Sequence, residues 1–270
     1  MSGRWLCGST SATFDRQRIR VPILLGNGVQ LLAMGERWML AILRSVLALR
    51  SGTFVDVGAN LGQTLLKVKL IDPGRRYCGF EPNPQAYHYL TELIRQNGFA
   101  NCRLYPLGLA ATTHVATLLS KADVDPSACI VAGFRPPARY SRSHPIAVFA
   151  GDAVAGELGD EVAVVKIDVE GGELEVLQGL HGTVARHRPF IFCEILPVFD
   201  SDSETGRFRL RRQRDVESLL AQWRYRMFRI HLDGTLSELD AIETHADMTR
   251  CNYLFAPESQ VAALLGRKRA

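Results

Sequence analysis

The sequence lacks the cysteine patterns that hold zinc or build a disulfide framework. Its six cysteines are scattered, no two of them form a Cys-x-x-Cys pair, and none stands at zinc-binding spacing from a histidine. Cys78 and Cys193 lie within apolar runs that resemble buried strands. This usage predicts buried, reduced thiols, which are typical of a cytoplasmic protein.

Long apolar runs and a strong charge excess are also missing. The longest apolar stretch near the N-terminus, Trp38 to Leu49, is interrupted by Arg44 and is too short to span a bilayer. Residues 1–20 contain no signal-peptide core. The formal net charge is only +4 over 270 residues, so we expect neither a membrane span nor a nucleic-acid partner.

Three motifs with a known ligand or catalytic role are absent as well. The chain has no Gly-x-Gly-x-x-Gly dinucleotide turn, no Gly-Lys-Ser/Thr phosphate loop and no Gly-x-Ser-x-Gly nucleophile turn. These absences disfavour a nicotinamide-dependent oxidoreductase and a hydrolase. The oxidoreductase stays as a minor alternative, which predicts binding of NAD.

What the sequence does contain, from Ser51 onward, is an alternation of strand-like and helix-like segments. The helix-like segments end at turn signals such as Asp72-Pro73-Gly74 and Asn97-Gly98. Such alternation predicts parallel βαβ units. The expected strands are 53–57, 76–80, 101–107, 162–167 and 189–195, the helices are 61–71, 85–97 and 173–180, and a closing strand pair is 225–232 with 252–256.

The chain is long enough for one α/β domain with additions at both ends. Residues 1–50 form an N-terminal extension, in which 1–20 are polar and expected to be loose at the end, while 36–49 have the spacing of a helix packed on the core. The predicted domain is 51–258, and 259–270 form a basic tail. Within the domain, the proline-rich segment 120–145 is expected to form a lid or a substrate wall.

Acidic residues and a glycine turn follow the first two strands of this domain. Asp56 ends the first strand, and the turn Gly58-Ala59-Asn60-Leu61-Gly62 would let a ligand approach the backbone. Glu81 ends the next strand, where an acid accepts hydrogen bonds from ribose hydroxyls in nucleotide-binding folds. The alternative role for Glu81 is to cap the helix that begins beside Pro82.

Three further acids follow or end later strands. Asp168 and Glu170 follow the strand 162–167, and Glu194 interrupts an apolar run. An acid at this edge of the sheet could serve as a general base, whereas the alternative is an ion pair with Lys166 and stabilisation of a helix N-terminus. Three acids could also bind a divalent cation, but no further Asp-Asn pair completes the oxygen ligands, so we expect no metal.

Arginines are concentrated between positions 207 and 229. A solvated helix face is the ordinary interpretation of this run. Because guanidinium groups bind phosphate and carboxylate, the alternative is an anionic acceptor, an anionic carrier or a membrane surface.

The motifs together resemble the FkbM-type methyltransferases. The likeness covers about 51–257, and its most specific part is Ile167 to Gly179. It implies a Rossmann-like α/β fold with a seven-stranded sheet, mostly parallel with a reversed C-terminal hairpin and with helices on both faces. The residues that carry it are Asp56-Val57-Gly58-Ala59-Asn60-x-Gly62, Glu81-Pro82, Lys166-Ile167-Asp168-Val169-Glu170-Gly171-x-Glu173 and Glu194.

The resemblance also implies a chemistry. The methyl donor would be S-adenosyl-L-methionine, and the acceptor would be a hydroxyl of a sugar or another small molecule. The alternative is an inactive cofactor-binding or scaffolding protein of the same fold. The implied cofactor-binding residues are Asp56, Gly58, Ala59, Asn60 and Gly62 at the methionine part, Glu81 at the ribose, and Asp168, while Asp168, Glu170 and Glu194 would border the reaction centre.

Overall fold

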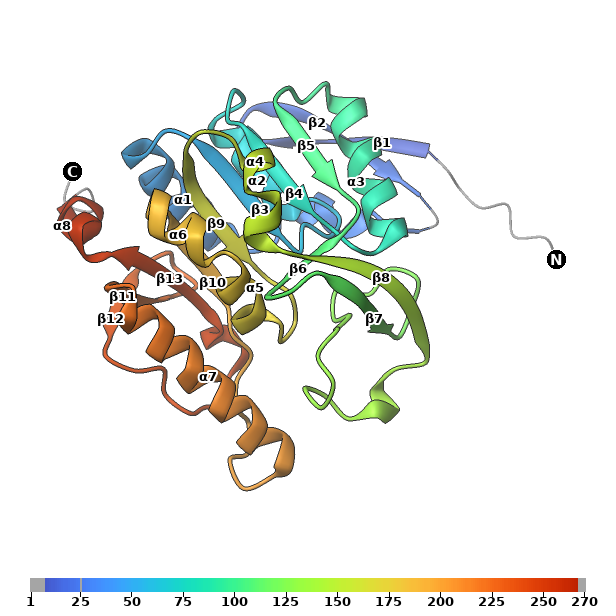
Figure 1. Ribbon diagram of the computed structural model, residues 1–270. Helices are drawn as coiled ribbons and strands as arrows, with labels where there is room; N and C mark the ends of the chain where they lie inside the picture. The colour runs from blue at the N-terminus through green and yellow to red at the C-terminus, as the bar shows by residue number, and fades with distance from the viewer. Residues whose placement is uncertain (1–7, 25, 267–270) are drawn as a thin grey trace.

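A mixed sheet of eight strands forms the centre of the molecule in the computed structural model, which describes residues 8–24 and 26–266 (Figure 1). The five strands from β10 to β5 run parallel, and β13, β11 and β12 run antiparallel to their neighbours. In order across the sheet the strands are β12 (Leu236–Leu239), β11 (Tyr225–Ile230), β13 (Asn252–Pro257), β10 (Phe190–Glu194), β9 (Val162–Ile167), β3 (Thr53–Val57), β4 (Tyr77–Phe80) and β5 (Cys102–Tyr105).

The α/β class is confirmed, whereas the expected count of seven strands is wrong. The eighth strand, β12, pairs with β11 after the turn at Asp233-Gly234. It has only four residues and two of them are polar, so its sequence carries little of the apolar alternation that marks a strand.

Helices cover both faces of the central sheet (Figure 1). Successive strand residues point to opposite faces, so Phe54 joins one apolar cluster while Val55 and Val57 join the other. The first cluster includes α1 (Arg37–Leu49), α2 (Gln63–Ile71), α3 (Pro84–Asn97) and α8 (Glu258–Gly266), and the second includes α4 (Ala155–Leu158), α5 (Glu173–Gly179), α6 (His181–His187) and α7 (Glu204–Gln222).

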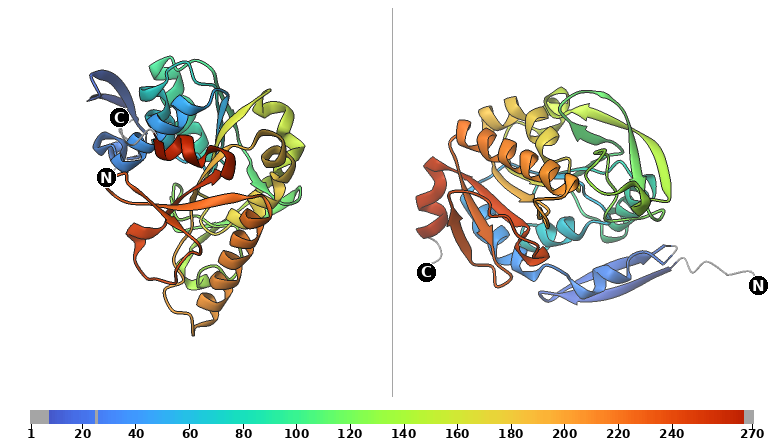
Figure 2. Two further views of the ribbon diagram at one scale, coloured as in Figure 1. Left: turned by 90° about the vertical axis from the view of Figure 1, so that its left-hand side faces the viewer. Right: turned by 90° about the horizontal axis from the view of Figure 1, so that it is seen from below.

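The N-terminal extension contains more structure than its sequence predicted. Strands β1 (Gly8–Phe14) and β2 (Gln17–Ile23) form a hairpin outside the central sheet, which the right-hand view of Figure 2 shows at the margin of the molecule. The hairpin is bound to α3, because the Tyr89 hydroxyl donates to the Pro22 carbonyl at 2.8 Å and Asn97 exchanges hydrogen bonds with the Arg20 backbone. The sequence had predicted no strands in this extension, and residues 1–7 lie outside the described part.

Short 3-10 helices complete the secondary structure at η1 (Val29–Ala33), η2 (Pro137–Arg139), η3 (Gly151–Val154) and η4 (Met248–Arg250). The expected C-terminal tail begins as α8, and its basic residues 267–269 lie outside the described residues. Across the described part of the chain, no helix is both long and apolar enough to cross a bilayer.

A second sheet of three strands lies beside the central one (Figure 1). It consists of β6 (Gly108–Ala110), β8 (Arg142–Ala150) and β7 (His114–Ser120), with β8 in the middle. The connection from β7 to β8, residues 121–141, is named the strap here. It corresponds to the proline-rich segment for which the sequence predicted a lid or substrate wall.

Candidate active site

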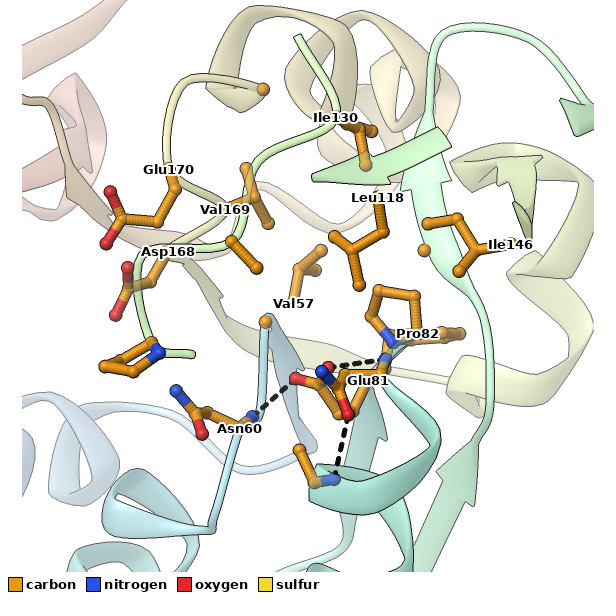
Figure 3. Close-up of a pocket in the computed structure, with 18 of the residues that line it drawn as sticks. Val57, Asn60, Glu81, Pro82, Leu118, Ile130, Ile146, Asp168, Val169 and Glu170 are labelled. Carbon is orange, nitrogen blue, oxygen red and sulfur yellow. Dashed lines mark hydrogen bonds between the residues drawn. The ribbon is translucent and has the colours of Figure 1, made fainter. Parts of the chain in front are cut away.

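A cavity lies over the carboxyl ends of the parallel strands (Figure 3). Parallel strands bring their carboxyl ends to one edge of the sheet, where open α/β folds bind ligands. The cavity has about 790 Å³ of space including its opening to solvent. Its walls come from the turn after β3, the end of β4, the start of β6, the segment after β9 and the strap.

Glu81 joins two of these walls. One of its carboxyl oxygens accepts the backbone N–H of Asn60 and the other accepts that of Asn83, both at 2.8 Å, as the dashed lines in Figure 3 show. Burial raises the pKa of Glu81 to about 7, although the two hydrogen bonds oppose the shift. Asn83 in turn caps α3, with its side chain accepting from two backbone N–H groups. Each carboxyl oxygen of Glu81 has a further lone pair that can accept a hydroxyl proton.

The glycines of the turn after β3 make room for the chain itself. Gly58 has φ +82, and a Cβ there would lie 1.9 Å from the carbonyl oxygen of Asp168. A Cβ on Gly62 would lie 2.6 Å from Leu90 of α3, and Gly62 does not line the cavity. Both glycines thus serve close packing of the turn, while Asn60 faces the cavity (Figure 3).

Asp56 and Ala59 lie behind the cavity wall. Asp56 is completely buried, accepts a hydrogen bond from the Tyr77 hydroxyl at 2.5 Å and lies 3.8 Å from the ammonium of Lys166. Burial raises its pKa to about 6, against the attraction of Lys166. Ala59 is 3% exposed. Lys166 therefore connects Asp56 to Asp168, which lines the cavity.

The three acids after β9 and β10 lie together. Asp168, Glu170 and Glu194 each offer one carboxyl oxygen within 4.8 Å of the others. Asp168 and Glu170 line the cavity, and Figure 3 shows their carboxyl groups side by side at one end of it. Glu194 lies next to them without lining this cavity. By its geometry the cluster can hold a shared proton or a cation.

The cluster divides its charge unequally. Burial tends to raise the pKa of Asp168, but Lys166, at 2.9 Å, and a hydrogen bond with Glu194 outweigh burial and hold that pKa below its usual value. Burial and the neighbouring Asp168 raise the pKa of Glu194 to about 10. Within this pair the negative charge is therefore favoured on Asp168 and the proton on Glu194. Burial also raises the pKa of Glu170, against an ion pair with Arg135 of the strap.

The cavity wall carries both acidic and apolar side chains. Its ionisable residues are Glu81, Asp125, Asp168 and Glu170, and no basic side chain is among the described residues that line it. Strap residues form part of the cavity wall, and that this segment is a lid or borders a substrate stays a prediction. The sequence did not single out Asn83 or the apolar lining residues Leu109, Leu118, Val124, Ile130 and Ile146.

These contacts fit a cationic nucleoside. The paired acceptor oxygens of Glu81 suit ribose hydroxyls, the apolar side chains suit a base, and an acid-rich wall suits a sulfonium charge. The model of the methyltransferase FkbM domain matches residues 56–227, which include every predicted site residue. The chain belongs to the FkbM methyltransferase family. Its cofactor is S-adenosylmethionine.

Solved structures with a related fold are distant in sequence. The methyltransferase FkbM of Methylobacillus flagellatus KT is 18% identical with a TM-score of 0.47, and the match covers 76% of this chain and 43% of that one. The precorrin-6y C5,15-methyltransferase of Geobacter metallireducens GS-15 is 12% identical with a TM-score of 0.39, and the match covers 80% of this chain and 85% of that one. SMU.1697c of Streptococcus mutans, in complex with SAH, is 9% identical with a TM-score of 0.43, and the match covers 80% of this chain and 94% of that one.

The chain thus spans less than half the length of its relative from Methylobacillus flagellatus. A search of curated proteins found no match to this chain.

Proposed function

We propose that this protein transfers a methyl group from S-adenosylmethionine to a hydroxyl oxygen of a sugar or another small molecule. The family supports methyl transfer. The observation that supports an oxygen acceptor is the ionised carboxylate of Asp168 at the cavity wall, since a hydroxyl must lose its proton when it is methylated.

The cofactor-binding residues in this proposal are those that frame the cavity. Glu81 would accept the ribose hydroxyls, and the turn from Gly58 to Asn60 would hold the methionine part. Bound S-adenosylmethionine supplies an electrophilic methyl group and leaves as S-adenosylhomocysteine. Asp56 and Gly62 would act from behind the wall, by fixing Lys166 and the turn.

Asp168 is the proposed proton acceptor. Lys166 and Glu194 hold its carboxylate in place before the reaction. Asp168 then accepts the proton that the acceptor hydroxyl loses as its oxygen takes up the methyl group. Positioning and fixed charges of this kind are usually the main contributions of an enzyme to such a transfer.

The acceptor is proposed to be uncharged. An anionic acceptor would meet four acids and no base among the described lining residues. In the arginine run between 207 and 229, Arg209 donates to the carbonyls of Phe134 and Pro197, and Arg212 forms an ion pair with Glu175. These two side chains are used within the fold.

Titration calorimetry tests the donor. Wild-type protein is expected to bind S-adenosylmethionine, and Glu81→Gln is expected to bind at least tenfold more weakly, since a good hydrogen bond to a charged group contributes about 1.5–3 kcal/mol. The matched control is Glu157→Gln, because Glu157 is exposed and does not line the cavity. Failure of the wild type to bind would overturn the proposal.

A panel of hydroxylated acceptors with methyl-labelled donor tests the transfer. Asp168→Asn is expected to retain donor binding and to lose at least a hundredfold in rate, the range for removal of a general base. Asp160→Asn, at an exposed acid outside the cavity, is the control. Donor binding without release of S-adenosylhomocysteine for any acceptor would favour the scaffolding alternative.

A further inference from the structure

The strap closes one side of the cavity but has few connections of its own. Val124, Asp125, Pro126, Ala128 and Ile130 all line the cavity. Within the strap, the backbone of Cys129 exchanges two hydrogen bonds with Leu119 at the end of β7, at 2.9 and 3.0 Å. The Ser141 N–H also donates to the Ser120 carbonyl at 3.1 Å, and the Asn83 amide donates to the Asp123 carbonyl at 2.8 Å. Further side chains add to these contacts.

Arg135 supplies a buried, charged side-chain contact of the strap. Its guanidinium forms an ion pair with Glu170, and their side chains are only 9% and 14% exposed. It also donates to the Ser127 carbonyl at 2.6 Å, so one side chain joins two parts of the strap to the end of β9. Breaking a buried pair leaves an uncompensated charge in place, which is far more costly than breaking an exposed one.

Phe134 and Gly171, which are next to Arg135 and Glu170 in the sequence, also contact each other. The ring of Phe134 lies against Gly171, where a Cβ would be 2.5 Å from the ring. Arg209 of α7 donates to the Phe134 carbonyl at 2.9 and 3.1 Å and lies 4.5 Å from the centre of the ring. Phe134–Arg135 and Glu170–Gly171 thus form one contact between the strap and the segment that carries Asp168.

We infer that Arg135 is a positioning residue that fastens the strap to the catalytic segment through Glu170, and that loosening of this pair speeds entry and release of the cofactor. The inference rests on the proposed function for the cofactor site. It assigns Glu170 to the strap contact, which leaves Asp168 as the proton acceptor. In the open state both side chains are hydrated, so opening does not leave a buried charge unpaired.

Cys129 provides a readout that needs neither activity nor cofactor. It is 1% exposed in the strap, whereas Cys193, at 2%, lies in the central sheet. Alkylation by iodoacetamide, followed by peptide mass spectrometry, therefore distinguishes strap opening from general unfolding. Arg135→Gln and Glu170→Gln are each expected to alkylate Cys129 about tenfold faster than wild type, with Cys193 unchanged.

Three further variants sharpen this test. Arg135→Lys keeps the charge but loses the second hydrogen bond, and is expected to be intermediate. The exchange Arg135→Glu with Glu170→Arg is expected to return the rate toward wild type. Arg103→Gln, which breaks the exposed pair with Glu157, is the matched control and should leave the rate unchanged.

Dissociation of S-adenosylhomocysteine, followed by surface plasmon resonance, gives the second measurement. It is expected to be about tenfold faster in Arg135→Gln. Unchanged Cys129 alkylation in both single variants would overturn the inference, as would equal acceleration at Cys193. Failure of the proposed function would instead appear as no cofactor binding by the wild type, while alkylation of Cys129 without cofactor still tests the strap contact.

Discussion

At the scale of single residues, the site depends on carboxyl groups that the fold keeps from ionising freely. Burial raises the pKa values of Asp56, Glu81, Glu173 and Glu194 above their usual values. Against the effect of burial, Lys166 and Glu194 lower the pKa of Asp168, and hydrogen bonds from Ser127 and Lys121 lower that of Asp125. The acids around the proposed reaction centre therefore differ in pKa, and each depends on specific neighbours.

The bond from Tyr77 to Asp56 is expected to be important for stability. Asp56 is buried and its other oxygen has no hydrogen-bond partner, so Tyr77→Phe leaves the carboxyl group without any. We expect the free energy of unfolding to fall by about 1–3 kcal/mol, measured by urea denaturation. Tyr105→Phe is the matched control, because Tyr105 donates to the exposed Glu157 at the same 2.5 Å. Equal losses in both variants would contradict the expectation.

Glu173 is expected to make stability depend on pH. Burial raises its pKa from 4.5 to about 7, so the folded state keeps a proton that the unfolded state has already released. The stability that Glu173 contributes is complete below pH 4.5 and is lost as pH rises through 7, by up to about 3 kcal/mol.

Glu173→Gln keeps an acceptor for the Gly171 N–H but cannot ionise. Urea denaturation at pH 5 and pH 8 is expected to show a smaller loss in this variant than in wild type. Parallel losses would show that Glu173 does not titrate in this range.

At the scale of elements, the docking of the strap is expected to depend on Gly171. Gly171 has φ +112 and lies beneath the Phe134 ring, so Gly171→Ala introduces both backbone strain and a clash. Gly133→Ala is the matched control, since Gly133 has φ +78 and no atom within 4 Å of its added Cβ. Calorimetry is expected to show at least tenfold weaker cofactor binding for Gly171→Ala only. Similar binding by the two variants would argue against the docking.

The elements also show what the sequence could and could not predict. Strands β3 and β9 were predicted with their observed bounds, because each is a β-branched, apolar run that ends at a glycine or an acid. The hairpin of β1 and β2 was missed, because the segment Gly8–Phe14 is mostly small and polar and pairs with β2, which in turn contacts α3. A local sequence pattern does not reveal a contact with an element that is distant in the sequence, such as α3.

The candidate site was likewise predictable only in part. The acids at strand ends were predicted, since parallel strands bring their ends together. That Asp56 and Gly62 lie behind the wall could not be predicted, because it depends on the side chains of Tyr77 and Leu90. The pair between Arg135 and Glu170 joins residues 35 positions apart without any periodic signal.

At the scale of the whole molecule, cofactor binding is expected to be coupled to folding. The cavity is built from both sheets and the strap, so a ligand there binds only the folded chain. S-adenosylmethionine at 100 times its dissociation constant should stabilise the fold by about 2.7 kcal/mol. In a thermal scan, this is a rise in Tm of roughly 5–10 °C. NAD should give none, and a rise with NAD would favour the oxidoreductase alternative.

The acidic wall also has a consequence for turnover. Each transfer removes one positive charge from the occupant of the cavity, while Glu81, Asp125, Asp168 and Glu170 remain in the wall. The spent cofactor therefore loses an attraction that the fresh one has, and exchange of one for the other is favoured after every cycle. An enzyme built in this way is expected to tolerate its own by-product and to keep working as S-adenosylhomocysteine accumulates.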